Sequence, residues 1–106
     1  MKIIRIWRGW TKPEKAKTYE LFLKEEVFPS VKEKGILGLE KVSISSRNLE
    51  NEVEFLLILQ FDGLDSVTQF AGENYSQAYI PEKANTLLER YDNTAQHYEL
   101  NDSFEL

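Results

Sequence analysis

The residues best suited to chemistry are one histidine and a cationic, aromatic stretch near the N-terminus. His97 is the only histidine among 106 residues, and an imidazole with an ordinary pKa of about 6.5 exchanges protons near neutrality. Residues 3 to 10 read IIRIWRGW. There Arg5 could hold an enolate or phenolate, and the indole of Trp7 could stack on an aromatic ring. We therefore predict His97 as a catalytic base, with Arg5 and Trp7 as substrate-binding residues.

Glu54 is the fourth candidate, as an acidic partner for Arg5. The two side chains would share a face if the strands that carry them were neighbours, and Glu54 would then join the substrate-binding group. Such a pair beside a histidine could bind a phenolate or carboxylate, or could only neutralise a buried charge. His97 and Trp7 could instead have purely structural roles. His97 would then be a hydrogen-bonded histidine on a strand, and Trp7 an aromatic residue of the core or of an interface.

Composition restricts the other kinds of chemistry. The chain has no cysteine, which excludes disulfides, thiolate catalysis, iron–sulfur clusters and cysteine-type zinc sites. One histidine and scattered carboxylates lack metal-ligand spacing, so no metal site is expected. Phosphate-binding glycine loops, nucleophile elbows and dinucleotide fingerprints are absent as well. We expect no cofactor, although a flavin or haem held by a shaped cavity stays open.

Charge and length indicate the setting. Thirteen basic and eighteen acidic residues give a net charge of −5, which argues against nucleic acid and anionic membranes as partners. The sequence has no signal-peptide-like or membrane-spanning apolar run, so a cytoplasmic location is the default. We expect a single domain over residues 1–100 and a short acidic tail over residues 101–106, with a small molecule as the partner.

Apolar periodicity near the N-terminus predicts a strand followed by a broken helix. Residues 3–10 are β-branched and aromatic, as in a strand. Thr11 is the expected N-cap of the helix, and Gly35 follows its last turn. Pro29 lies inside the helical pattern, so the helix should break or kink near residues 27–28.

The rest of the chain alternates between strands and helices. Strands are predicted over residues 39–47 and 52–62, joined by a polar hairpin turn. A short helix over residues 64–71 ends at Gly72, and a second helical stripe runs through Ala84, Leu87, Leu88 and Tyr91. Residues 94–100 form the last strand.

This order predicts an α+β, ferredoxin-like βαββαβ domain with a four-stranded antiparallel sheet and helices on one face. Ile4 and Ile6 are better suited than Arg5 and Trp7 to the apolar core between sheet and helices. The opposite face would then carry Arg5, Trp7, Leu56 and Ile58. Because a bare apolar sheet face normally marks an interface, we predict a homodimer, with a cavity between sheet and helices or between two sheets.

Three stretches carry a family resemblance: the strand and helix IIRIWRGWTKPEKAKTYELF, the helix exit KEKGILGLEK, and LQFDGLDSVTQFAG. Over residues 2 to 100 the sequence resembles the antibiotic biosynthesis monooxygenase superfamily, the dimeric α/β-barrel proteins. The resemblance implies a homodimer and, as in several members, cofactor-independent oxidation of electron-rich aromatics by O2. Other members degrade haem, and many have no assigned activity.

The sequence departs from the haem-degrading members at the residues that matter most. Those proteins use an asparagine on the first strand, a tryptophan on the third strand and a histidine in the second helical region. Here the first strand offers Arg5, Trp7 and Arg8, the third strand ends at Phe61, and no histidine lies between residues 62 and 93. We therefore do not expect haem degradation by that route.

The resemblance favours a monooxygenase that acts on a small aromatic or quinol-like compound, with His97 as base and Arg5 and Trp7 orienting the substrate. Proton removal would give a carbanion that reacts with O2 without a metal. Two alternatives stay open. One is a non-oxidative lyase or isomerase that uses the same base, and the other is a non-catalytic ligand-binding or stress-response protein.

Overall fold

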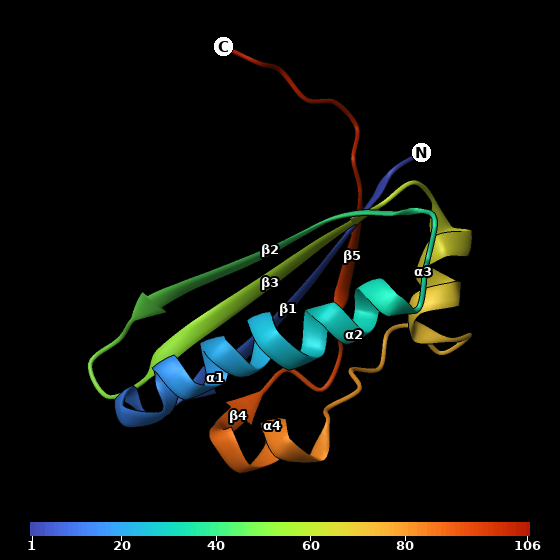
Figure 1. The fold of residues 1–106 in the computed structure, drawn as a ribbon. Helices are drawn as coiled ribbons and strands as arrows, with labels where there is room; N and C mark the ends of the chain where they lie inside the picture. The colour runs from blue at the N-terminus through green and yellow to red at the C-terminus, as the bar shows by residue number, and fades with distance from the viewer.

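An antiparallel sheet and a long broken helix that crosses one of its faces make up most of the structure (Figure 1). The computed structural model describes residues 1–106. Its strands are β1 (Ile3–Thr11), β2 (Leu39–Asn48), β3 (Val53–Phe61), β4 (Leu88–Tyr91) and β5 (Gln96–Glu99). They lie in the order β2-β3-β1, and the short strands β4 and β5 share the free edge of β1. The predicted ferredoxin-like α+β fold is confirmed, with two short strands in place of the single last strand.

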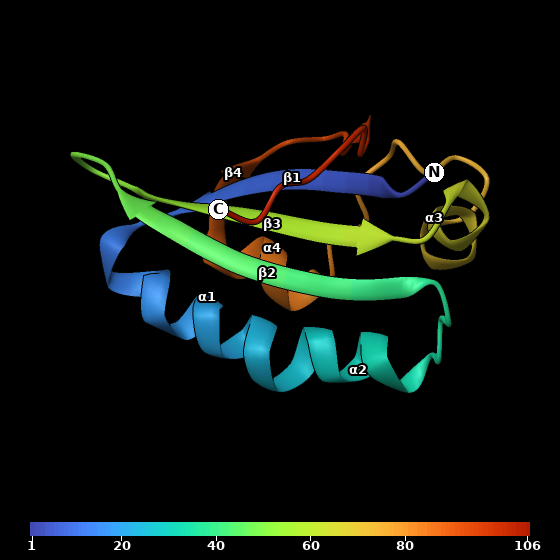
Figure 2. The same cartoon turned by 90° about the horizontal axis from the view of Figure 1, so that it is seen from above.

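The long helix is built from consecutive segments: a 3-10 turn η1 (Pro13–Lys15), α1 (Ala16–Phe22), a π-helical turn η2 (Leu23–Val27) and α2 (Phe28–Glu33). Figure 2 shows α1 and α2 as one rod alongside the strands. Pro29 has no N–H to donate to the preceding turn, and the widened π turn lies immediately before the segment that contains it. The predicted break near residues 27–28 is confirmed.

The predicted start of this helix at Thr11 is wrong. Thr11 is the last residue of β1, fully buried, and is paired with Val53 and Leu88. Both neighbouring strands extend far enough to hold it, so pairing keeps the chain extended for one more residue. The flanking residue at the start of η1 is Lys12, and no side chain caps that end.

The second helical stripe is also shorter than predicted. The helix α4 spans Glu82–Leu87, and Leu88 to Tyr91 form β4 instead. The spacing of Leu88 and Tyr91 fits a helix, but the open edge of β1 beside Gly9 and Trp10 offers backbone hydrogen bonds to a strand. The other helix, α3 (Leu64–Ala71), ends before Gly72 as predicted.

The two faces of β1 are the reverse of the prediction. Arg5 lies opposite Leu59 and Trp7 opposite Leu57, so both side chains lie on the face that the helices cover. Ile4 and Ile6 lie on the other face, partly exposed. The predicted apolar face of β3 is the core face, with Phe55 and Phe61 almost completely buried. Apolarity could not separate the faces, because a central strand is apolar on both.

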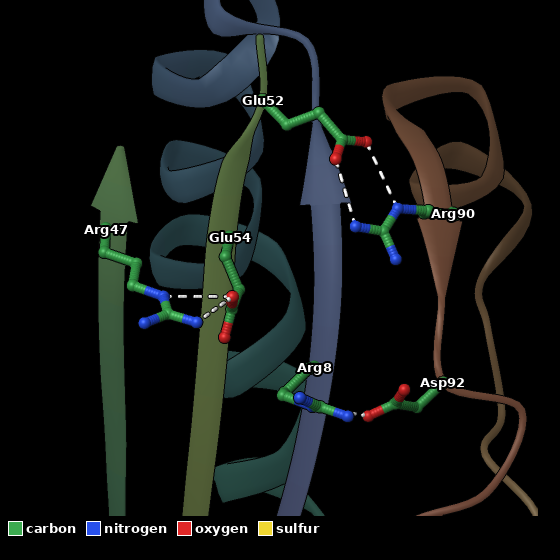
Figure 3. A network of polar contacts seen from close by, with 6 residues as sticks. All are labelled: Arg8, Arg47, Glu52, Glu54, Arg90 and Asp92. Carbon is green, nitrogen blue, oxygen red and sulfur yellow. Dashed lines mark hydrogen bonds and ion pairs between the residues drawn. The ribbon is translucent and has the colours of Figure 1, made fainter. Parts of the chain in front are cut away.

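The face away from the long helix combines an apolar centre with charged pairs. Besides Ile4 and Ile6 it carries Leu56 and Ile58 of β3, both partly exposed. Figure 3 shows three arginine–carboxylate pairs from β1 to β4 and their ends: Arg8–Asp92, Arg47–Glu54 and Arg90–Glu52. Trp7 was predicted on this face, but Trp10 lies there instead. The guanidinium of Arg90 stacks on the ring of Trp10, 4.0 Å from the ring centroid.

The final residues, 101–106, form no regular structure and are exposed. Figure 1 shows them running away from the rest of the chain. None of the helices is both long and apolar enough to cross a membrane.

Candidate functional site

A cavity of about 710 Å³ lies between the sheet and the long helix. Strands β1 and β3 form its floor, η2 and α2 one wall, and residues 77–81 with the end of α3 the other. Of its 21 lining residues, 15 are hydrophobic, so it suits a mainly apolar molecule of ordinary ligand size. Its exposed lining residues, which mark the opening to solvent, include Glu26, Ser30, Lys34 and Tyr79.

Arg5 places a buried positive charge in this apolar lining. Only 6% of the residue is exposed. Its Nη1 donates to the carbonyl oxygen of Tyr75 at 2.6 Å and lies 3.0 Å from Nε2 of His97. The guanidinium also lies over the ring of Phe70, 5.4 Å from the centroid. Burial lowers the pKa of Arg5 from its usual value, but an arginine still carries its charge at neutral pH.

His97 lies directly beside Arg5 but outside the cavity lining. The two residues are paired across β1 and β5. The sequence alone could not give this register. Because a guanidinium can only donate, Nε2 of His97 accepts this hydrogen bond and the ring proton belongs on Nδ1. Burial, and then the charge of Arg5, lower the pKa of His97. His97 is therefore neutral at neutral pH, with its Nε2 lone pair already engaged.

Trp7 forms part of the cavity floor, next to Arg5 along β1. Its indole N–H donates to the carbonyl oxygen of Asp92 at 2.8 Å, which fixes the ring. Gly9 leaves the space that the ring fills, because a Cβ there would lie 2.7 Å from Cη2 of Trp7. Trp7 thus gives the cavity a fixed aromatic surface, on which a planar ligand could stack.

Glu54 does not join this group. Its carboxylate lies on the other face of the sheet and accepts two hydrogen bonds from Arg47, at 2.8 and 3.0 Å. The expected Arg5–Glu54 pair is wrong, although β1 and β3 are neighbours as required. The register pairs odd residues of β1 with odd residues of β3, so Arg5 and an even-numbered residue point to opposite faces.

Sequence reasoning missed the contribution of the long helix to the cavity. Tyr19 of α1 is 2% exposed and lines the cavity with Phe22 and Leu23. Burial alone raises the pKa of its phenol, with no hydrogen bond to offset it. A lone hydroxyl in an apolar helical stripe was the available signal. Of the two tyrosines between α3 and α4, Tyr79 lines the cavity, whereas the ring of Tyr75 lies nearly perpendicular to the ring of His97.

Nowhere in the structure do three or more histidine, aspartate or glutamate side chains come together in a way that could hold a metal ion. The polar groups of the cavity offer a ligand hydrogen bonds and charge.

Comparison with solved structures finds the same fold in other proteins. A candidate antibiotic biosynthesis monooxygenase from Bacillus cereus superposes with a TM-score of 0.66 at 10% sequence identity, covering 100% of this chain and 97% of the other. Rv0793 from Mycobacterium tuberculosis gives a TM-score of 0.65 at 14% identity, covering 99% and 100%. No protein-family model and no curated protein matches the sequence. The chain therefore has the fold of these two proteins over its whole length, as its resemblance to the antibiotic biosynthesis monooxygenases implied.

Proposed function

We propose that the chain is a monooxygenase that binds a small aromatic or quinol-like compound in the cavity and oxidises it with O2, without a resident cofactor. The observation that carries the proposal is the cavity itself, an apolar space that Arg5 and Trp7 help to line. The fold shared with a candidate antibiotic biosynthesis monooxygenase supports this class of reaction.

The proposed chemistry needs only groups of the chain and of the substrate. A ring methylene beside a carbonyl or phenol loses a proton, and the carbanion transfers electrons to O2. Conversion of the methylene to a ketone then releases one water, so one O2 is consumed and every oxygen atom is accounted for. Trp7 would stack on the ring, and Arg5 would hold the oxygen atom that takes up negative charge.

His97 is the proposed base, and its geometry sets a condition on that role. Its Nε2 accepts a hydrogen bond from Arg5, so this nitrogen is available only when the guanidinium moves. Negative charge that develops in the cavity would draw Arg5 toward it and free the imidazole. Because the pKa of His97 is lowered, the neutral form needed for proton uptake is already present at neutral pH.

The position of His97 behind Arg5 favours a second candidate, a non-catalytic protein that binds the same class of ligand. In that case Arg5 and Trp7 bind the ligand, and His97 only holds the guanidinium in place. A lyase or isomerase would need the same base as the oxygenase.

We also propose that two copies associate through the sheet face away from the long helix. Four partly exposed apolar side chains lie at its centre, and a surface of this kind is normally covered. The residues are Ile4, Ile6, Leu56 and Ile58.

Oxygen uptake tests the proposal. Phenols and cyclic ketones of one to three fused rings, each with a ring methylene beside the phenol or carbonyl, would be incubated with the protein in an oxygen electrode cell, and products identified by mass spectrometry. We expect one O2 consumed per substrate, and about 10²–10⁴-fold slower turnover for His97→Ala, the usual contribution of a general base. Lys24→Gln, on the outside of the helix, is the matched control. Saturable binding with no turnover would support the non-catalytic candidate, and turnover without oxygen uptake the lyase or isomerase.

A further inference from the structure

Arg5 differs from the other arginines of the chain in having no carboxylate partner. Arg8, Arg47 and Arg90 each form an ion pair with an acidic side chain, and these three pairs are seen in Figure 3. All three have exposed side chains. Arg5 is the buried one, at 6% exposure, and takes part in none of the ion pairs of the chain.

A buried charge without a counter-ion is costly to a fold. Removing a guanidinium from water is opposed by its loss of hydration, and the usual compensation is a carboxylate within hydrogen-bond reach. The two partners of Arg5 are neutral, a backbone carbonyl and an imidazole. The missing element of this site is therefore a negative charge, and the cavity that Arg5 lines is a space in which a ligand could supply it.

The hydrogen bonds that Arg5 already makes define which edge of the guanidinium is free. Both contacts, to the Tyr75 carbonyl and to His97, use Nη1. Nε and Nη2 have no partner in the protein, and neither is sealed from solvent, because the only enclosed side-chain atom without a partner is Oγ1 of Thr11. These two nitrogens present parallel N–H groups on one edge, the arrangement that binds both oxygens of a carboxylate at once.

The remainder of the cavity indicates the body of the ligand. Trp7 and Leu57 form the next layer of the floor beyond Arg5. Tyr19 also lines the cavity, and its phenol adds a hydroxyl to a mainly apolar surface. A volume of about 710 Å³ has room for two or three fused rings.

We infer that the ligand of this cavity is an aromatic carboxylic acid. Its carboxylate binds the Nε–Nη2 edge of Arg5, its rings lie against Trp7, and a hydroxyl or carbonyl group on the rings meets Tyr19. A phenolate has only one oxygen and would leave one of the two parallel N–H groups unused. A phosphate dianion would need more than the single buried cation. The inference rests on the proposed function in using the same cavity, and it names the substrate class. In a substrate of this class the carboxylate occupies Arg5, so the oxygen atom that takes up negative charge in the reaction would meet the hydroxyl of Tyr19 instead.

Matched pairs of acid and amide test the inference directly. Benzoate, 2-naphthoate and 9-anthroate, each with its neutral amide, would be titrated against the protein by calorimetry at neutral pH. The two members of a pair have nearly the same shape, so a difference in affinity reports the charge. We expect at least one acid to bind more than tenfold more tightly than its amide, the range of a two-point ionic hydrogen bond.

Substitution of the guanidinium locates that preference. Arg5→Met keeps the length of the side chain and removes a buried charge, so it should fold and should abolish the preference for the acid. Arg5→Lys keeps the charge but loses the parallel N–H groups, and should retain only part of the preference. Lys34 is the other cation of the cavity lining, so Lys34→Gln tests whether it, rather than Arg5, gives the preference, which should remain in this variant. Lys24→Gln, an exposed residue of the helix that does not line the cavity, is the control.

Several outcomes would overturn the inference. They are equal binding of acid and amide, no binding of any acid at millimolar concentration, and an acid preference that survives in Arg5→Met or disappears in Lys34→Gln. Oxygen uptake separates this result from the proposed function. A preference for acids without oxygen uptake would leave the carboxylate site in place and refute the monooxygenase. Oxidation of neutral phenols with no preference for acids would support the monooxygenase and refute the carboxylate site.

Discussion

Substitution of Gly9 by alanine should destabilise the protein through the side chain of Trp7. A Cβ at this position would lie 2.7 Å from Cη2 and 3.1 Å from Cζ3 of the indole, and 3.0 Å from Cδ2 of Leu88. The indole cannot simply rotate away, because its N–H is bonded to the carbonyl oxygen of Asp92 and its ring packs near Tyr91. The added methyl group therefore has to displace a fixed ring or the adjoining strand.

The size of the effect follows from two opposing contributions. Alanine is ordinarily more stable than glycine inside a strand by about 0.5–1 kcal/mol. Overpacking of a filled core costs about 1–3 kcal/mol. The expected net loss for Gly9→Ala is up to about 2.5 kcal/mol, which lowers the Tm of a domain of this size by up to roughly 20 °C.

A double-mutant cycle isolates the contact. Trp7→Phe removes the ring atoms that the new methyl group would meet, so Gly9→Ala should become neutral or stabilising in that background. Thermal and urea unfolding, followed by circular dichroism, would give the four free energies of unfolding. We expect a coupling energy of about 1–3 kcal/mol. If Gly9→Ala raises the stability of the wild type, or costs the same with and without the indole, the packing of Trp7 over Gly9 is not as described.

Two further predictions concern the open sheet face and the histidine. The protein should be a dimer by light scattering at micromolar concentration, and Ile58→Asp should dissociate or unfold it because a charge enters a dry interface. The control variant Thr18→Asp, on an exposed part of α1, should stay dimeric. A monomeric wild type would contradict the proposed interface. Because the folded-state pKa of His97 is lowered, its contribution to stability is present above about pH 6.5 and is lost as the pH falls below that value. His97→Gln, which can still accept a hydrogen bond from Arg5, should lose less stability between about pH 7 and pH 5 in urea titrations; an unchanged pH dependence would show that His97 titrates normally.

Local sequence patterns are enough to predict the class of fold and the order of most of its elements. Alternation over residues 53–61 and helical spacing over residues 16–33 are local patterns, and both survive in the structure. Pro29 also acts locally, because its missing N–H breaks the helix whatever packs against it. The candidate residues Arg5 and Trp7 could be selected from the same evidence, since a cation and an indole inside an apolar strand require special surroundings.

The face of β1 that these residues occupy, and the groups that surround them, follow from the three-dimensional arrangement of the strands. Both faces of a central strand are apolar, so the pairing of Arg5 with Leu59 had to be known before its side could be assigned. The same register separates Arg5 from Glu54 and brings it beside His97, 92 residues later in the chain. Contacts of this kind depend on long-range strand pairing, which the local pattern of side chains does not encode. The absence of a counter-ion for Arg5 could be seen only when every side chain around it was in place.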